Sequence, residues 1–254
     1  MKKLVYQEPK CFIENFKYTF CPGCGHGFVL GIVAQLIDEF GLQGDTIAVS
    51  SVGCSIFLEK FFNLDVVGAS HGRSPCVATG VKRSKPDKFV FTYQGDGDAL
   101  TIGFNETCHT ALRGEKITTI CINNTNFGMT GGQASATSLP GQKTKTTPFG
   151  RDVNRYGYPI KAAEMIASCD GAAFVARCAV GSHKFYDDTK KIIRKAFLNQ
   201  INNIGYSFVE VLSSCPTNWG MSPIDANKHI VENVAKYYKL GVFKDITNEM
   251  KCAL

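Results

Sequence analysis

The sequence contains no long hydrophobic run. No stretch of its 254 residues approaches the roughly 18 apolar residues that a membrane-spanning helix needs. Residues 1–10, which begin Met1-Lys2-Lys3, lack the apolar core of a signal peptide. We therefore expect a cytoplasmic protein.

Blocks of like charge are absent as well. The formal net charge is +6, and the basic residues are spread along the chain. This distribution argues against nucleic-acid binding, whereas a mildly basic face can still attract an acidic protein partner. The sequence also has no internal repeat and no low-complexity tract.

A disulfide framework is not expected either. The eleven cysteines are an odd number, in a chain without a secretion signal. The ferredoxin-type run Cys-x-x-Cys-x-x-Cys is missing. Cys11, Cys76 and Cys252 have no evident partner motif.

Apolar runs of strand length alternate with helical patterns along the chain. The expected strands are 46–52, 65–69, 88–94, 117–122, 174–180 and 207–212, and the expected helices are 28–40, 75–84, 99–113, 160–169, 185–203 and 223–238. The alternation predicts an α/β fold with one doubly wound, mostly parallel sheet and helices on both faces. We expect a single domain over 1–254, with an N-terminal arm at 1–20 lying across a partner subunit and a C-terminal tail at 239–254 that frays. The polar segment 134–159 exceeds the usual loop length and is typical of a lid or a partner contact.

Polar residues follow two of the expected strands directly. Gly95-Asp96-Gly97-Asp98 follows strand 88–94, and Asn123-Asn124 follows strand 117–122. Ligands of parallel sheets bind at these carboxyl ends, and glycine lets the backbone approach a diphosphate closely. A carboxylate with carboxamide and carbonyl oxygens suits Mg²⁺. The alternative is that Gly-Asp-Gly-Asp is only a surface turn.

Gly-Asp-Gly, then a helix and a strand, then Asn-Asn resembles the diphosphate-binding motif of thiamine diphosphate enzymes. The resemblance implies that Asp96, the Asn124 side chain and the backbone carbonyl of Asn126 bind Mg²⁺.

Four cysteines occupy positions next to the same sheet edge. Cys21 and Cys24 flank a tight Pro-Gly turn, while Cys54 and Cys215 follow strands at their carboxyl ends. Four converging thiolates would bind Zn²⁺ or a [4Fe–4S] cluster, and spacing alone does not distinguish the two. A third interpretation is that only the Cys21–Cys24 pair matters, as a redox pair or a coincidence.

Six motifs together resemble the thiamine-binding β subunit of the 2-oxoacid:ferredoxin oxidoreductases, over nearly the whole chain. In chain order they are Cys21-Pro-Gly-Cys24-Gly, Val52-Gly-Cys54-Ser, Ser70-His71-Gly-Arg73, Gly95-Asp-Gly-Asp98, Phe127-Gly-Met-Thr-Gly-Gly-Gln133 and Ser214-Cys215-Pro-Thr-Asn218. In that family a [4Fe–4S] cluster lies close to the thiamine, with Cys21, Cys24, Cys54 and Cys215 as the implied ligands here.

The resemblance also implies which residues contact thiamine diphosphate. His71 is the catalytic candidate, with helix capping or packing as its alternative, and Arg73 would pair with phosphate or with a structural carboxylate. The expected cofactor contacts are Val52, Gly53, Cys54, Ser55, His71, Gly72, Arg73, Gly95, Gly97, Asp98, Gly128, Met129, Thr130, Gly131, Gly132 and Gln133.

The implied activity is oxidative decarboxylation of a 2-oxoacid with CoA, giving acyl-CoA and CO₂, with electrons passing through the cluster to ferredoxin. Segment 140–150 resembles the 2-oxoisovalerate enzymes most closely and the 2-oxoglutarate enzymes next. Gly131, where two-subunit members tend to carry lysine, favours the multisubunit type.

The thiamine-activating carboxylate has no obvious counterpart in this chain. The resemblance implies an α subunit that completes the site, a γ subunit and a ferredoxin-like subunit with further clusters. The competing interpretations are a non-oxidative thiamine decarboxylase or synthase subunit, and a Cys₄ zinc scaffold that assembles partner proteins.

Overall fold

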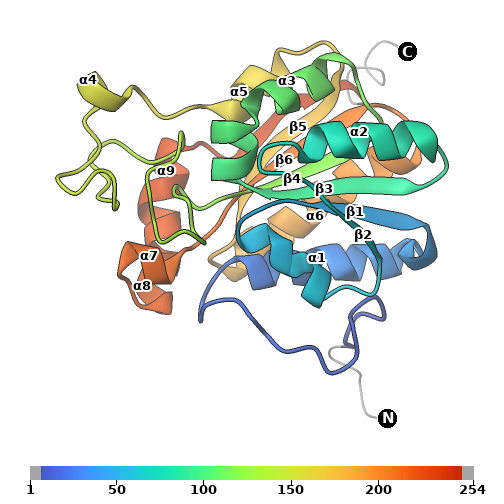
Figure 1. The fold of residues 1–254 in the computed structure, drawn as a ribbon, viewed down its shortest axis with the longest axis horizontal. Helices are drawn as coiled ribbons and strands as arrows, with labels where there is room; N and C mark the ends of the chain where they lie inside the picture. Colours follow the sequence, from blue (N-terminus) through green and yellow to red (C-terminus); the bar gives the residue numbers. More distant parts are fainter. Residues whose placement is uncertain (1–6, 248–254) are drawn as a thin grey trace.

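A computed structural model describes residues 7–247. Within this range the strands form one sheet in the order β2-β1-β3-β4-β6-β5-β7 (Figure 1). The strands are β1 Thr46–Ser50, β2 Asp65–Gly68, β3 Phe89–Gly95, β4 Thr118–Asn123, β5 Ala172–Ala179, β6 Tyr206–Leu212 and β7 Gly241–Asp245. All neighbouring pairs are parallel except β5 with β7. The predicted doubly wound, mostly parallel α/β sheet is confirmed.

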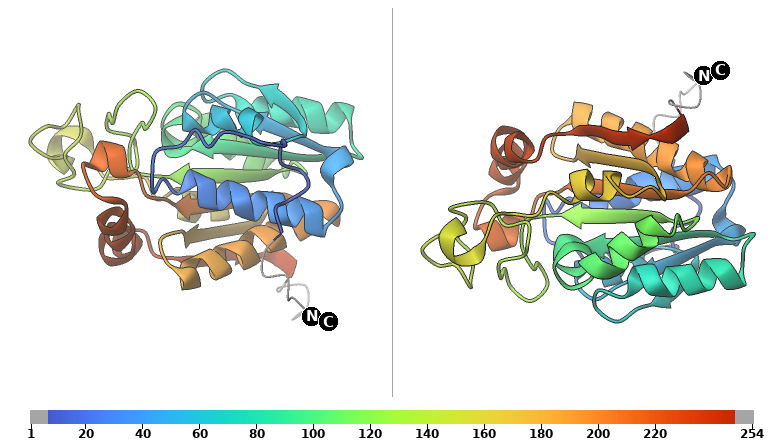
Figure 2. Two further views of the ribbon diagram at one scale, coloured as in Figure 1. Left: turned by 90° about the horizontal axis from the view of Figure 1, so that it is seen from below. Right: turned by 90° about the horizontal axis from the view of Figure 1, so that it is seen from above.

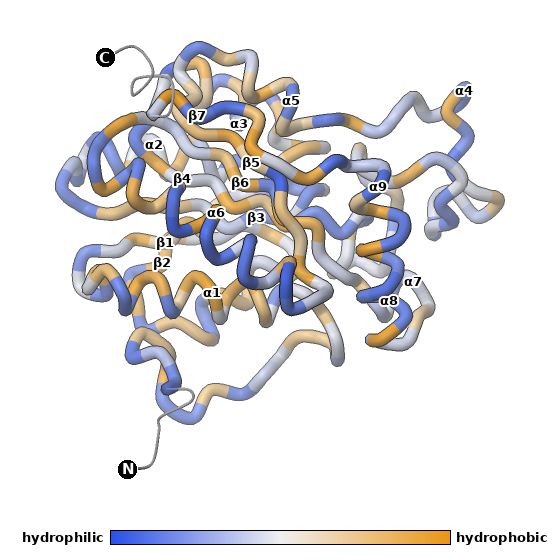
Figure 3. The backbone as a smooth tube through the Cα atoms, turned by 180° about the vertical axis from the view of Figure 1, so that it is seen from behind, coloured by the Kyte–Doolittle hydropathy of each residue, from blue (hydrophilic) through white to orange (hydrophobic). Residues whose placement is uncertain are grey.

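The central strands are buried on both faces. Every residue of β4, β5 and β6 is buried, which explains why most of their residues are apolar. In Figure 3 hydrophobic segments dominate α1 and the central strands.

Helices cover both faces of the sheet (Figure 2). α1 (His26–Glu39) and α6 (His183–Ile201) pack on one face, whereas α2 (Ser74–Ser84), α3 (Phe104–Leu112) and α5 (Ala162–Ala167) pack on the other. The short α-helices are α4 Val153–Tyr156, α7 Pro216–Trp219, α8 Pro223–His229 and α9 Ala235–Tyr237. Short 3₁₀-helices lie at Gln43–Asp45 and Cys54–Lys60, and short π-helices, here also called π turns, lie at Gly97–Ile102 and Ile230–Val234. No helix within 7–247 is long and apolar enough to cross a membrane.

Two expected helices are interrupted by π turns. The segment expected as helix 99–113 begins with a π turn and continues as α3 after Gly103. A Cβ at Gly103 would lie 2.3 Å from the Gly72 carbonyl oxygen, so this point is a close backbone approach. The helix expected at 223–238 is divided into α8, a π turn and α9.

The prediction of a tail that frays from residue 239 is wrong for 241–245, which form β7 along β5. At the other end, residues 7–20 are irregular and pack on the chain's own core, where Phe12 pairs with Phe62. Their contact with a partner stays a prediction, and residues 1–6 and 248–254 lie outside the described range.

The sheet register brings several strand ends to one level. Gly95 of β3 lies opposite Ile122 of β4, and Asn123 lies opposite Leu212 of β6. The residues that follow these positions therefore leave the sheet side by side. The long segment that includes α4 projects from this same edge, on the left in Figure 1.

Candidate cofactor and metal site

Two adjacent cavities open at the carboxyl edge of the sheet. The first, here the carboxylate cavity, has a volume of about 80 Å³ and is lined by His26, Val52, Gly53, Cys54, His71, Gly95, Asp96, Gly97, Asp98, Asn124, Asn126, Phe127, Gly128, Met129 and Thr130. The second, here the cysteine cavity, has a volume of about 380 Å³ and is lined by Thr19, Phe20, Cys21, Cys24, Cys54, Phe57, Asn124, Gly128, Met129, Gly131, Cys215, Pro216, Thr217 and Asn218. Cys54, Asn124, Gly128 and Met129 belong to both linings, so the two cavities share a wall.

Most of the expected site residues are brought together at these cavities. The expected cofactor contacts that line neither one are Ser55, Gly72, Arg73, Gly132 and Gln133. Ser55 is buried and donates to the Ser51 carbonyl at 3.2 Å, so its hydroxyl is used within the chain.

Asp96 lies at the end of β3 and is fully buried. Its Oδ2 accepts a hydrogen bond from Ser135 Oγ at 2.6 Å and another from Thr137 Oγ1. Burial raises the pKa of the Asp96 carboxyl to about 6, and the two hydroxyl donors act in the opposite direction. A buried carboxylate held this way favours a nearby cation.

The Asn124 carboxamide points at the other oxygen of Asp96. One of its two terminal atoms lies 2.7 Å from the Asn126 carbonyl oxygen and 3.0 Å from Asp96 Oδ1. With nitrogen at this position, the carboxamide donates two hydrogen bonds. Rotating the carboxamide by half a turn puts its oxygen there instead, beside Asp96 Oδ1 and the Asn126 carbonyl oxygen.

That three-oxygen arrangement fits Mg²⁺. Octahedral Mg²⁺ with bonds of 2.0–2.1 Å places neighbouring ligand oxygens about 2.9 Å apart. The two measured separations, 2.7 and 3.0 Å, bracket this value. Asp96, Asn124 and the Asn126 carbonyl are therefore a suitable set of magnesium ligands, and their binding of Mg²⁺, which the resemblance implied, stays a prediction.

Asp98 is occupied by protein donors. It is buried, and its Oδ1 accepts from Ser51 Oγ at 2.7 Å, from the Gly72 N–H at 2.5 Å and from His71 Nδ1. Gln94 Nε2 donates to Oδ2 at 2.5 Å. Asp98 therefore ties together the loops that follow β1 and β2, while its predicted contact with a diphosphate stays a prediction.

His71 and Arg73 lie in the loop after β2. Because Nδ1 of His71 is held by Asp98, Nε2 is the ring nitrogen left for a ligand, and the ring lies edge-on to Phe127 at 6.1 Å. Arg73 is paired with Glu106, which is the structural-carboxylate alternative of the two considered for this residue.

The second glycine-rich loop, Phe127–Gln133, is closed by its own backbone. The Phe127 N–H donates to the Gln133 carbonyl at 2.9 Å, and the Gly132 N–H donates to the Phe127 carbonyl at 2.9 Å. Gly131 and Gly132 have φ of 104° and 91°, which favour glycine. The turn places Gly128 between Asn124 and Cys54: a Cβ there would lie 3.4 and 3.3 Å from their side chains.

The four predicted cysteines line the cysteine cavity together. Burial raises the pKa of the Cys24 thiol to about 12 and that of Cys54 to about 11, and the neighbouring cysteines raise both further. Burial also raises the pKa of the Cys215 thiol, whereas Asn218, which donates to its sulfur at 3.4 Å, lowers it. Ionising these thiols together requires a positively charged group between them.

The four cysteines line one cavity but are not a compact metal group. Within residues 7–247, no three His, Cys, Asp or Glu side chains form a group that could hold a metal ion. Their binding of a [4Fe–4S] cluster or of Zn²⁺ therefore stays a prediction.

Sequence reasoning missed several residues of the site. Ser135 and Thr137, which hold Asp96, lie in the irregular segment after the glycine-rich loop, and no local pattern marks them. His26, for which the sequence favoured a structural role, lines the carboxylate cavity, and its Nδ1 lies 2.9 Å from Tyr93 Oη. Burial lowers the pKa of His26 to about 4, so the imidazole is neutral at physiological pH.

Sequence comparison places this chain among thiamine-dependent proteins. The profile of the family "Thiamine pyrophosphate enzyme, C-terminal TPP binding domain" matches residues 51–211. Ketoisovalerate oxidoreductase subunit VorA of Methanothermobacter marburgensis is 38% identical over 258 residues, covering 98% of this chain and 54% of VorA. 2-oxoglutarate synthase subunit KorB of Archaeoglobus fulgidus is 36% identical over 249 residues, covering 94% of this chain and 89% of KorB.

A solved structure has the same fold. The 2-oxoglutarate:ferredoxin oxidoreductase from Magnetococcus marinus, with 2-oxoglutarate, coenzyme A and succinyl-CoA bound, matches with a TM-score of 0.74 and 30% identity, covering 85% of this chain and 70% of that one. This chain spans about half the length of the two VorA proteins that it matches, 54% and 48%.

Proposed function

The chain belongs to the thiamine pyrophosphate enzymes, among the 2-oxoacid:ferredoxin oxidoreductase subunits, and from this premise we propose that it is the thiamine-binding subunit of such an oxidoreductase. The proposed reaction converts a 2-oxoacid and CoA into an acyl-CoA and CO₂, and reduces ferredoxin. A branched-chain substrate, 2-oxoisovalerate, is favoured, and 2-oxoglutarate is next. The names of the VorA and KorB relatives support this order.

The observation that carries the proposal is the meeting of Asp96 Oδ1, the Asn124 carboxamide and the Asn126 carbonyl oxygen at the sheet edge. With its oxygen turned toward them, the carboxamide lies 3.0 Å from Asp96 Oδ1 and 2.7 Å from the Asn126 carbonyl oxygen, and these separations suit octahedral Mg²⁺. In this proposal they hold Mg²⁺, which binds the diphosphate of thiamine diphosphate. The bound thiamine supplies the decarboxylation chemistry, while the protein supplies orientation and electrostatics.

The remaining cofactor contacts follow from the lining of the carboxylate cavity. Gly97, Gly128, Met129 and Thr130 approach the diphosphate, and Val52, Gly53 and Cys54 lie along the cofactor. A Cβ at Gly97 would lie 2.5 Å from the Phe127 ring, so a residue without a side chain is needed at this point of the cavity lining. His71 offers Nε2 to the bound cofactor or substrate, because Asp98 fixes its Nδ1.

We assign the cysteine cavity to a [4Fe–4S] cluster with Cys21, Cys24, Cys54 and Cys215 as ligands. Support comes from their shared cavity and from their mutual effect on pKa. The shared wall, which includes Cys54, gives electrons a short route between the two cavities.

The proposed complex contains further subunits. An α subunit completes the thiamine site and supplies the activating carboxylate, and a γ subunit and a ferredoxin-like subunit accompany it. Ferredoxin accepts the electrons, and CoA accepts the acyl group. We treat residues 1–254 as one thiamine-binding domain and expect the complex in the cytoplasm.

The test is anaerobic purification of the chain in complex with its partner subunits. We expect iron, sulfide, magnesium and thiamine diphosphate in the complex, with broad absorption near roughly 400 nm from thiolate–iron charge transfer. The complex should reduce methyl viologen with a 2-oxoacid and CoA, and comparison of 2-oxoisovalerate, 2-oxoglutarate and pyruvate identifies the substrate.

Two results would contradict the proposal. Zinc without iron or thiamine would favour the Cys₄ scaffold. Thiamine diphosphate without iron, in protein purified anaerobically, would favour a non-oxidative decarboxylase or synthase.

A further inference from the structure

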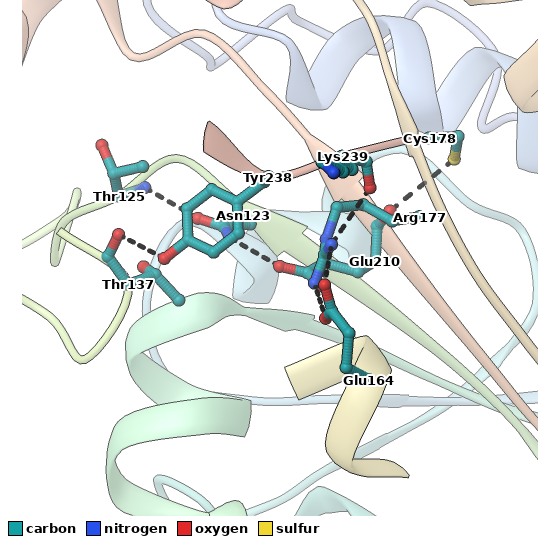
Figure 4. Close-up of polar contacts among 9 residues, drawn as sticks. All are labelled: Asn123, Thr125, Thr137, Glu164, Arg177, Cys178, Glu210, Tyr238 and Lys239. Atoms are coloured by element: carbon teal, nitrogen blue, oxygen red, sulfur yellow. Dashed lines mark hydrogen bonds and ion pairs between the residues drawn. The ribbon is translucent and has the colours of Figure 1, made fainter. Parts of the chain in front are cut away.

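A fully buried ion pair joins the neighbouring strands β5 and β6. Arg177 of β5 and Glu210 of β6 are both 0% exposed, and Arg177 Nε donates to Glu210 Oε2 at 2.8 Å (Figure 4). The guanidinium also donates to both oxygens of Glu164, at 3.0 and 2.6 Å, and to the Lys239 carbonyl at 3.1 Å. Neither charge reaches solvent.

One branch of this cluster leads to the turn that carries Asn124 and Asn126. Glu210 Oε1 accepts from Asn123 Nδ2 at 2.7 Å, which fixes which end of the Asn123 carboxamide points at Glu210. The opposite end, Asn123 Oδ1, then accepts from the Thr125 N–H at 3.0 Å.

Thr125 needs this support. Its φ is +59°, a left-handed conformation that β-branched residues rarely adopt. From the other side, Ser138 Oγ and Gln142 Nε2 donate to the Thr125 carbonyl at 2.5 and 3.1 Å. The conformation of Thr125 directs the Asn124 side chain and the Asn126 carbonyl toward the same point.

A second branch leads to Asp96. The Tyr238 ring lies over the Arg177 guanidinium, 5.2 Å from centroid to Cζ, and is fully buried. Tyr238 Oη donates to the Thr137 carbonyl at 2.8 Å, and Thr137 Oγ1 donates to Asp96. Both branches therefore begin at Arg177: the first ends at Thr125, between the proposed ligands Asn124 and Asn126, and the second ends at the proposed ligand Asp96.

A buried ion pair is a weak source of stability, because desolvation offsets the attraction between the charges. We propose that Glu210, held by Arg177, is a positioning residue for Mg²⁺: it orients Asn123, and Asn123 holds the Thr125 turn in its ligand-presenting conformation. This inference rests on the proposed function and adds a supporting layer behind the ligands, a layer that commonly tunes metal affinity.

The decisive change is Glu210→Gln. A glutamine offers one acceptor to two donors, Arg177 Nε and Asn123 Nδ2. If the Asn123 carboxamide turns over to match, its nitrogen faces the Thr125 N–H and the turn loses its acceptor. We expect Mg²⁺ to bind about tenfold more weakly.

A double variant, Glu210→Gln with Asn123→Asp, provides the rescue. The carboxylate introduced at position 123 accepts with one oxygen from the carboxamide nitrogen introduced at position 210, and with the other oxygen from the Thr125 N–H. The carboxamide oxygen at position 210 then accepts from Arg177. Every hydrogen bond of the branch is restored with the same total charge, so Mg²⁺ affinity should return to near the wild-type value.

The matched control is Thr118→Val, at the opposite end of β4. It removes the hydrogen bond from Thr118 Oγ1 to Gln200 Oε1, which is 2.7 Å long and equally buried. This variant should lower the melting temperature without changing Mg²⁺ affinity. Tyr238→Phe, which removes one hydroxyl and leaves the ion pair intact, tests the second branch and should weaken Mg²⁺ binding by less than Glu210→Gln does.

The measurement is calorimetric titration of Mg²⁺ into the complex saturated with thiamine diphosphate, together with thermal melting. Weaker binding by Glu210→Gln, rescue by the double variant and no change in Thr118→Val support the inference. A Glu210→Gln complex that melts earlier but binds Mg²⁺ as wild type does would overturn it, and so would a double variant that binds no better than Glu210→Gln. Absence of Mg²⁺-dependent binding in wild type would instead overturn the proposed function, and this inference with it.

Discussion

The two cavities differ in how the protein holds their side chains. In the carboxylate cavity, Asp96 and Asp98 each accept hydrogen bonds from side chains on other elements. In the cysteine cavity, Asn218 donates a hydrogen bond to Cys215 Sγ. Burial is the largest cause of the raised pKa values of the Cys24 and Cys215 thiols.

This difference reflects the chemistry of the ligands. Oxygen ligands for Mg²⁺ are polar whether or not the ion is bound, so protein donors can orient them in advance. Thiols are weak hydrogen-bonding groups and become ligands only as thiolates, so their arrangement depends on the metal they hold. The carboxylate side should therefore respond to changes in supporting residues, and the cysteine side chiefly to loss of a sulfur.

The largest effect should follow from Asp96→Asn. The change removes the only carboxylate of the proposed magnesium set, and the weakening of Mg²⁺-dependent thiamine diphosphate binding should exceed roughly 100-fold, since even supporting residues account for 10–100-fold. Calorimetry measures this, and Asp170→Asn, an exposed aspartate, is the control. Iron content should stay at the wild-type level, and a loss of iron would show that the two cavities are not separable.

Cys24→Ser is the reciprocal change. Cys24 lines only the cysteine cavity, and we expect the complex to lose its cluster iron and its viologen reductase activity. Thiamine diphosphate should still bind with wild-type affinity, and Cys76→Ser, at an exposed cysteine, should change neither quantity. Full iron content in Cys24→Ser would remove this residue from the ligand set.

Gly103→Ala tests the close backbone contact between Gly103 and Gly72. The new Cβ would meet the Gly72 carbonyl at 2.3 Å, and backbone atoms cannot step aside as a side chain does. We expect unfolding to become easier by about 1–3 kcal/mol. Gly80→Ala in α2 has no atom within 4 Å of the new Cβ and should stabilise by about 0.5–1 kcal/mol. Chemical denaturation compares the two, and equal stabilities would contradict the close approach.

The smallest effect should come from Ser135→Ala. Asp96 Oδ2 keeps the Thr137 donor but loses the 2.6 Å hydrogen bond from Ser135, so Mg²⁺ affinity should fall by about tenfold. Ser168→Ala, an exposed serine that donates to the Met165 carbonyl, is the matched control for the titration. An unchanged affinity would mean that the hydrogen bond from Ser135 is not needed to orient the Asp96 carboxylate for Mg²⁺.

The strand-end residues were predictable from the sequence, because their positions follow from where the apolar runs of strand length end. Asp96 and Asn124 come directly after runs that are buried on both faces, and parallel register then brings them together. The four cysteines were placed at the same sheet edge by the same reasoning, but the resemblance was needed to favour an iron–sulfur cluster over zinc, because thiolate spacing does not distinguish the two.

The supporting residues were not predictable in the same way. Ser135 and Thr137 reach Asp96 from an irregular segment whose path is set by contacts such as Arg151 Nη1 with the Ser135 carbonyl at 2.8 Å. β7 was read as a frayed tail because Gly241–Asp245 is short and half-exposed, and only pairing with β5 makes it a strand. Both depend on tertiary contacts that a local pattern does not contain.

β7 has a consequence for the behaviour of the chain in solution. It covers one edge of β5, a strand whose eight residues are all buried, and its charged residues Lys244 and Asp245 lie opposite Val175 and Phe174. A chain shortened before Gly241 would leave β5 with a row of unpaired backbone groups and apolar side chains, which is a template for self-association. β7 therefore protects this edge of the sheet from self-association, although none of its residues lines either cavity.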